Sequence, residues 1–154
     1  IEMVEIGCGG FPGNAHANPD VLLNDGDTVS LAGTEILCLS TPGHTDGTMS
    51  FFFDTTDGKK TLRAGMHGGV GTNTLSTVFL RTYGLSLSQR EKYLNSLNYV
   101  RDQKVEIFLG NHVWNNDTLT KLKKVQNGDP DAFVCPGDWQ IFIDRLADSM
   151  KKMR

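Results

Sequence analysis

Cysteine and long apolar runs are both scarce in this sequence. The three cysteines are scattered along the chain, and no two of them form a C-x-x-C pair. This pattern indicates neither a disulfide framework nor a thiolate metal site, and it favours a reducing compartment, so we expect a cytoplasmic protein. No apolar run approaches the roughly 20 residues of a transmembrane helix, and the first residues do not resemble a signal peptide. A membrane is therefore not expected as a partner.

Positive charge is limited, and several nucleotide and nucleophile motifs are missing. The chain has 15 Lys and Arg against 18 Asp and Glu, a formal charge of -3, and it has no basic stripe that would neutralise phosphates. Nucleic acid is therefore not an expected partner. The glycine-rich segment GMHGGVG lacks the Lys-Ser/Thr pair of a P-loop, and no G-x-S-x-G elbow is present. Phosphate cradling and a serine nucleophile are both disfavoured.

The chain divides into a short irregular segment and one structural unit. Residues 1–19 are rich in glycine and show neither helix nor strand periodicity, so we expect them to be irregular, with His16 at the surface. The chain opens on Ile1 without a methionine, which suggests that it is part of something longer. Residues 20–154 carry all the regular patterns and are expected to form a single unit.

Four strands are predicted in the first half of that unit. Residues 28–31 and 34–40 favour strands and are joined by the small pair Ala32-Gly33, which predicts a hairpin. The segment TMSFFFD then favours a strand up to the turn signal Asp57-Gly58, and TLRAG favours the next strand.

Helices dominate the second half. Ser88 and Glu91 have the spacing of a capping box and predict a helix over about 88–102. VEIFLG predicts a short strand, and NDTLTKLKKV an amphipathic helix. The segment 138–150 predicts a helix with its apolar stripe in the core. The order of these elements indicates an α/β or α+β layered fold, with a mostly antiparallel or mixed sheet and helices on one face.

Three of the four histidines share one setting. His44, His67 and His112 each follow a predicted strand and lie within two residues of a glycine. Side chains at strand ends are rigidly held, and imidazole is a common zinc ligand, so the shared placement favours a metal site. Each histidine taken singly is better explained as a turn residue bonded to the backbone, and it is the three together that favour a metal. If the strand continues through both residues, Met66 and His67 point to opposite faces.

Several longer segments point to a family. DVLLNDGDTVSLAGTEILCLSTPGHTDGTMSFFF, followed by GMHGGVG, VEIFLGNHVWNNDTLTKLKKV and PGDWQIFIDRL, resembles the C-terminal half of metallo-β-lactamase superfamily domains. Within that superfamily, these segments resemble an uncharacterised branch that is similar to the lactamase subclass without a cysteine ligand. The resemblance implies half of the αββα metallo-β-lactamase fold over about residues 20–150.

The resemblance also assigns site residues. His44 matches the third histidine of the first zinc site, and His112 the final histidine of the second. His67, Asp46 and Thr45 are further candidates, either as ligands or as residues that orient one. The family binds two zinc ions and uses metal-bound hydroxide on a small-molecule ester, amide or lactam-type substrate. The resemblance therefore implies a zinc-dependent hydrolase.

Two departures limit that implication. The family's main metal-binding motif, H-x-H-x-D-H, occurs nowhere in the chain, and Met66 occupies the position where many members have a bridging aspartate or a cysteine. We therefore expect the isolated chain to be inactive and its zinc content partial or nil. Its expected partner is a missing N-terminal half or a second copy. Two alternatives remain: a non-catalytic half-fold that acts as an interaction module, and a site built from His44, His67 and His112.

Overall fold

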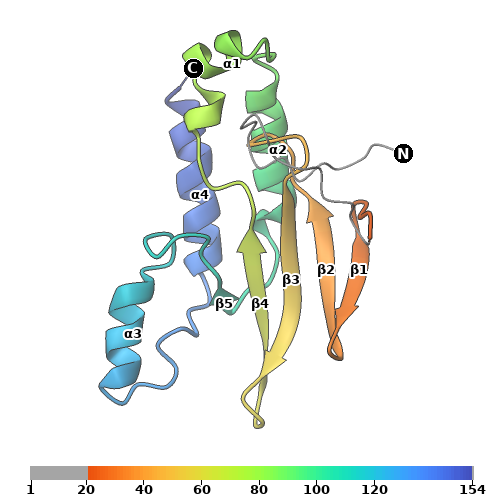
Figure 1. Cartoon of the computed structure of the whole chain (residues 1–154). Helices are drawn as coiled ribbons and strands as arrows, with labels where there is room; N and C mark the ends of the chain where they lie inside the picture. Colours follow the sequence, from red (N-terminus) through yellow and green to blue (C-terminus); the bar gives the residue numbers. More distant parts are fainter. Residues whose placement is uncertain (1–20, 154) are drawn as a thin grey trace, which may run out of the picture.

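Five strands form one mixed sheet in the computed structural model, which describes residues 21–153 (Figure 1). The strands lie side by side in chain order: β1 (Asp27–Leu31), β2 (Thr34–Ser40), β3 (Met49–Thr56), β4 (Thr61–His67) and β5 (Ile107–Phe108). The first four pair antiparallel, and β5 pairs parallel to β4. The predicted hairpin, the layered class and the mixed sheet are confirmed, while residues 1–19, including His16, lie outside the described part.

Four α-helices and one 3-10 turn complete the described chain. They are η1 (Asn73–Leu75), α1 (Thr77–Thr82), α2 (Gln89–Arg101), α3 (Thr118–Gln126) and α4 (Asp138–Lys151). Figure 1 shows α2 and α4 running along the sheet and α3 standing apart from it. No helix in residues 21–153 is long and apolar enough to cross a membrane.

Two details of the predicted elements are wrong. Ser88 does not cap α2 with its side chain, because its backbone is already helical, with φ of -61° and ψ of -16°; its hydroxyl donates to the Ser86 hydroxyl at 2.9 Å. The predicted strand at VEIFLG shrinks to the two residues of β5. Its pairing to β4 ends at the bond from the Leu109 N–H to the Gly65 carbonyl. The Asn116 side-chain amide donates to the Phe108 carbonyl at 2.8 Å.

The main core lies between one face of the sheet and the helices. All five residues of the predicted apolar stripe on α4 are buried: Trp139, Phe142, Ile143, Leu146 and Met150. Trp139 contacts Phe52 of β3 edge-on, with ring centroids 5.3 Å apart, and its indole N–H donates to the Val100 carbonyl at 2.8 Å. This one side chain therefore joins the sheet, the end of α2 and α4.

The second face of the sheet is apolar but does not belong to that core. Because side chains alternate along a strand, the residues next to Leu39 and Phe52 point the other way. Cys38 and Ala64 are buried there, whereas four larger side chains stay half-buried and outside the core cluster: Ile36, Phe51, Phe53 and Met66.

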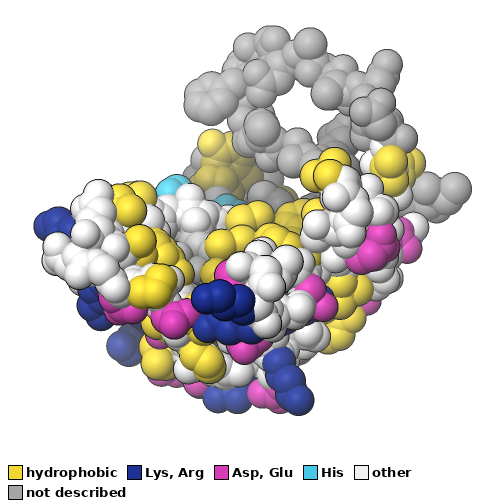
Figure 2. Space-filling view, turned by 90° about the horizontal axis from the view of Figure 1, so that it is seen from below, with side chains coloured by type: hydrophobic (Ala, Val, Ile, Leu, Met, Phe, Trp, Pro, Cys, Tyr) yellow, Lys and Arg dark blue, Asp and Glu magenta, His cyan; other side chains and the backbone are white. Residues whose placement is uncertain are grey.

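Helix α3 also carries an unpartnered apolar face. Leu119, Leu122 and Val125 are 58%, 43% and 38% exposed, while the residue that α3 buries is Lys121, whose ammonium lies 2.6 Å from the Asp138 carboxylate. Figure 2 shows hydrophobic side chains gathered along the α3 side at the left and across the middle of the view. The described part therefore presents apolar surface that its own helices do not cover.

We expect Trp139→Phe to lower the free energy of unfolding by about 2 to 4 kcal/mol, because it removes the buried bond from the indole to the Val100 carbonyl and opens a cavity. Urea unfolding followed by circular dichroism measures this. Trp114→Phe is the matched control: that indole is 69% exposed, so its loss should cost less than about 0.5 kcal/mol. An equal loss of unfolding free energy in the two variants would contradict the assignment of Trp139 as the side chain that joins the sheet to α2 and α4.

Candidate functional site

His44 lies in the connection between β2 and β3, which packs against α2. The segment is closed at its base by the Thr41 N–H, which donates to the Thr48 carbonyl at 2.8 Å. Gly43 has φ of 135°, and a Cβ there would lie 2.5 Å from the Tyr93 Cα. Only glycine combines that backbone conformation with such a close approach to a helix. The T-P-G-H sequence thus places the imidazole at a fixed point above α2.

The imidazole of His44 is oriented by a backbone carbonyl. Its Nδ1 lies 2.7 Å from the Gly71 carbonyl oxygen, although 27 residues separate the two in sequence. A carbonyl only accepts, so Nδ1 carries the proton and the Nε2 lone pair is left for another partner. This is the arrangement in which a ligating histidine is held by its other ring nitrogen.

The glycine-rich segment 68–71 lies directly against this histidine. A Cβ on Gly69 would lie 2.9 Å from the His44 Cβ, and one on Gly71 would lie 3.3 Å from the His44 Cε1. A Cβ on Gly68 would collide with the Met49 carbonyl. GMHGGVG is therefore glycine-rich because its backbone packs on the candidate site.

His67, the last residue of β4, is fully buried on the helix-covered face. Its Nδ1 lies 2.8 Å from the Ser50 hydroxyl, its ring is 6.2 Å from the Tyr93 ring, and its Nε2 has no hydrogen-bond partner. Burial lowers the pKa of His67 to about 4. Met66 points to the second face of the sheet, as strand alternation predicts. His67 is therefore neutral at pH 7 and belongs to the interior.

His112 is exposed and follows β5. Its ring stacks on Trp114, with ring centroids 4.5 Å apart and planes 9° from parallel. The backbone N–H of His112 donates to the Asn115 side-chain oxygen at 3.0 Å. The neighbouring Asn111 donates to the Gly68 carbonyl at 3.3 Å. The loop of His112 therefore meets the same glycine-rich segment that orients His44.

Asp46 and Thr45 bond away from the histidines. The Asp46 carboxylate accepts from the Gln89 amide at 3.1 Å and from the Lys92 ammonium at 3.2 Å, and these hydrogen bonds lower its pKa. The Thr45 hydroxyl lies 2.9 Å from the Thr48 hydroxyl. Both residues brace the loop, Asp46 by tying it to α2.

The donor set is incomplete in the described part. Within residues 21–153, no three His, Cys, Asp or Glu side chains come together as a metal site. His44, His67 and His112 therefore do not form one cluster in this structure. The free Nε2 of His44 fits a zinc ligand, and the exposed imidazole of His112 is accessible as another. A catalytic zinc normally has three protein ligands, so these two do not complete a site.

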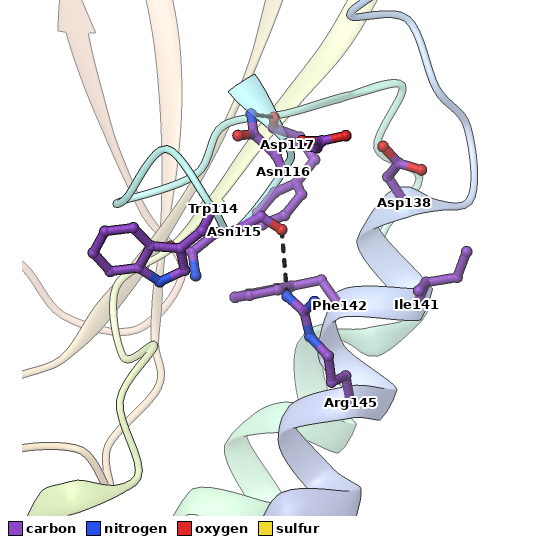
Figure 3. A pocket seen from close by; sticks show the side chains of 9 residues that line it. Trp114, Asn115, Asn116, Asp117, Asp138, Ile141, Phe142 and Arg145 are labelled. Carbon is purple, nitrogen blue, oxygen red and sulfur yellow. Dashed lines mark hydrogen bonds between the residues drawn. The ribbon is translucent and has the colours of Figure 1, made fainter. Parts of the chain in front are cut away.

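A small open pocket lies beside the His112 loop (Figure 3). It is enclosed by the loop around Trp114 and Asn115 and by the first turns of α4. In it, Arg145 reaches across to the Asn115 carbonyl at 3.4 Å and lies over the Phe142 ring. None of the three histidines lines this pocket, so it is separate from the candidate site.

The sequence placed all three histidines just after strands; this holds for His44 and His112, whereas His67 is the last residue of β4 itself. It did not identify the groups that hold the imidazoles in place. The Gly71 carbonyl and the buried environment of His67 depend on segments distant in the chain. The run of glycines was the one available signal, since close backbone approach is a common reason for glycine.

Known structures resemble this chain over half of their length. No protein-family model matches the sequence, and no curated protein matches it significantly. The FEZ-1 metallo-β-lactamase from Legionella gormanii superposes with a TM-score of 0.78 at 26% identity, over 90% of this chain and 52% of that one. BJP-1, a subclass B3 metallo-β-lactamase of Bradyrhizobium japonicum, gives 0.77 at 22% identity, over 90% and 51%.

A third match carries a statement about metal. The class B3 enzyme LRA-12 from an Alaskan soil metagenome, described as a di-zinc metallo-β-lactamase, gives a TM-score of 0.71 at 24% identity, over 87% of this chain and 50% of its own. The chain thus has the fold of about half a subclass B3 metallo-β-lactamase and spans about half the length of the structures it matches.

Acid should destabilise the protein through His67. Its pKa is lowered from 6.5 to about 4, so between those values the unfolded chain binds more protons than the folded one. This contribution is fully present above about pH 6.5 and is lost as the pH falls towards 4, by roughly 3 kcal/mol in total. Urea unfolding at a series of pH values measures it.

His67→Leu should flatten that pH dependence, because the titrating group is gone while Ser50 keeps the Thr41 hydroxyl at 2.9 Å. His112→Ala, at an exposed position, is the control and should keep the wild-type slope. If the leucine variant retained the full slope, another group would be responsible.

Proposed function

We propose that this chain, with the fold of half a subclass B3 metallo-β-lactamase, is the C-terminal part of a zinc-dependent hydrolase. The observation that carries the proposal is the His44 imidazole: Gly71 holds its Nδ1 at 2.7 Å and leaves Nε2 free, as a metal ligand requires. The loop of His112 reaches the same segment through Asn111 and Gly68. The resemblance of T-P-G-H and L-G-N-H to the family's ligand positions supports the same assignment.

In the complete protein, His44 and His112 would each contribute one nitrogen ligand, and the remainder of the fold would contribute the others. A zinc ion held there would supply activation of water near neutral pH for the hydrolysis of an ester, amide or lactam-type small molecule. The residues of this chain hold donors in place: Gly71 fixes His44, and Trp114 stacks on His112. His67 is neutral and buried beneath them.

The surface that receives the rest of the fold is the second face of the sheet. Its half-buried phenylalanines and the exposed leucines of α3 are apolar, and exposed apolar patches of this kind mark contacts with other chain segments. The chain covers 51% and 52% of the two structures matched here, so a second half of comparable size is available in that fold.

A second candidate function rests on the same surface. A half-fold with an apolar sheet face can serve as an interaction module without catalysis, and in that case two copies pair through it. The upstream reading frame separates the two functions: an encoded H-x-H-x-D-H supports the hydrolase, and its absence from the natural protein supports the module.

Zinc binding tests the ligand assignment. We expect the isolated chain, purified without chelator, to hold well under one zinc per chain by plasma mass spectrometry, because it offers two donors where a catalytic site needs three. Zinc added in excess should shift the ring resonances of His44 and His112 together. Both His44→Ala and His112→Ala should abolish the shift at the remaining histidine, whereas His67→Ala should leave it intact. A comparable loss in His67→Ala would favour the three-histidine site.

Self-association tests the surface. We expect the isolated chain to associate in sedimentation equilibrium through its second sheet face, and the pair Phe51→Lys and Phe53→Lys to shift it towards monomer. Val78→Lys, at a side chain that is 76% exposed on α1, is the matched control and should change nothing. A wild-type chain that is monomeric with a well-dispersed spectrum would count against an uncovered interface.

A further inference from the structure

Thr74 contacts both the ring and the backbone of His44. Its hydroxyl oxygen lies 3.2 Å from the His44 Nδ1 and 3.2 Å from the His44 carbonyl oxygen. The carbonyl only accepts, so the single hydroxyl proton goes to it, and a lone pair of the same oxygen faces Nδ1. Together with the Gly71 carbonyl at 2.7 Å, two acceptors then surround the Nδ1 proton.

The opposite tautomer is excluded by the same geometry. With the proton on Nε2, the Nδ1 lone pair would face the Gly71 carbonyl oxygen at 2.7 Å with no hydrogen between them. The threonine hydroxyl could satisfy that lone pair only by giving up its bond to the His44 carbonyl. Thr74 and Gly71 therefore favour the same proton position from two directions.

The turn that carries Thr74 is held in place by hydrogen bonds from α2. It belongs to η1, whose next residue, Leu75, is fully buried. The Leu75 carbonyl accepts from the Arg90 Nε at 2.9 Å, and the same guanidinium donates to the Thr77 hydroxyl at 2.8 Å and to the Met153 carbonyl at 3.1 Å. One arginine of α2 thus fixes the turn that presents Thr74.

We infer that Thr74 is a positioning residue for His44, which bridges the ring and the backbone of that residue and so fixes the direction of the Nε2 lone pair. The effect on the order of the ring is a property of this chain alone. Its consequence for zinc affinity rests on the proposed function. Residues that orient a ligating histidine typically contribute about 10- to 100-fold to metal affinity.

The tautomer is measured first, on metal-free protein. Long-range proton–nitrogen correlation spectra of the histidine-labelled full chain, at about pH 9 where an ordinary imidazole is neutral, identify which ring nitrogen is protonated. The wild type should show His44 as Nδ1–H, with the signal assigned by its loss in His44→Ala. Thr74→Val should keep the Nδ1–H form, because the Gly71 carbonyl remains, but nitrogen relaxation at the His44 ring should show a more mobile ring. Thr74→Ser, which keeps the hydroxyl, should restore the wild-type order of the ring.

Zinc is then titrated into the same samples. The zinc concentration that gives half of the shift at the His44 ring should be about 10-fold higher in Thr74→Val than in the wild type. In Thr74→Ser it should lie within about 2-fold of the wild-type value. Should the valine variant fail to fold, Thr74→Ala removes the hydroxyl with less change in shape.

The outcomes separate the two proposals. An unchanged mobility of the His44 ring in the folded Val or Ala variant, or an Nε2–H form in the wild type, overturns the role of Thr74. A more mobile ring in these variants with no His44-dependent zinc shift in any variant supports that role and counts against the hydrolase assignment.

Discussion

The candidate site depends on one close approach, that of the backbone of residues 68–71 to His44. No side chain fits between them, because a Cβ on Gly69 or Gly71 would lie 2.9 Å and 3.3 Å from atoms of His44. The approach brings the Gly71 carbonyl within bonding distance of the imidazole and leaves the Gly68 carbonyl for Asn111 and the Gly69 carbonyl for the Tyr93 hydroxyl at 2.7 Å. One short segment therefore ties together β4, α2 and the loops of both candidate ligands, His44 and His112.

The two candidate ligands differ in how far they are prepared for binding. His44 is half-buried, with its ring fixed by acceptors on a braced turn. His112 is exposed and is held by a stacked indole and a backbone bond to Asn115. A ligand that is ordered beforehand loses less conformational entropy on binding than one that is not. We expect His44 to define where a metal sits and His112 to adjust to it.

Much of the fold was predictable because local patterns and tertiary packing agree. The stripe on α4 and the hairpin of β1 and β2 needed only periodicity and turn chemistry. The capping box failed because the backbone of Ser88 is itself helical and not in the extended conformation of an N-cap. The supports of His44 were beyond local reasoning, since Gly71 and Thr74 lie 27 and 30 residues away. His112 was identified through family resemblance, and nothing in the described contacts alone marks it as a ligand.

The parallel pairing of β5 has a consequence for how the site is built during folding. Strands β1 to β4 join through short turns, whereas β5 reaches β4 only after the chain has passed through α1 and α2. Contacts between distant segments carry the larger loop-closure cost and form late. His44 lies in the loop between β2 and β3, and His112 lies in the loop that follows β5. The distance between the two imidazoles therefore depends on the long-range pairing of β5 with β4, and it reports whether that pairing has formed.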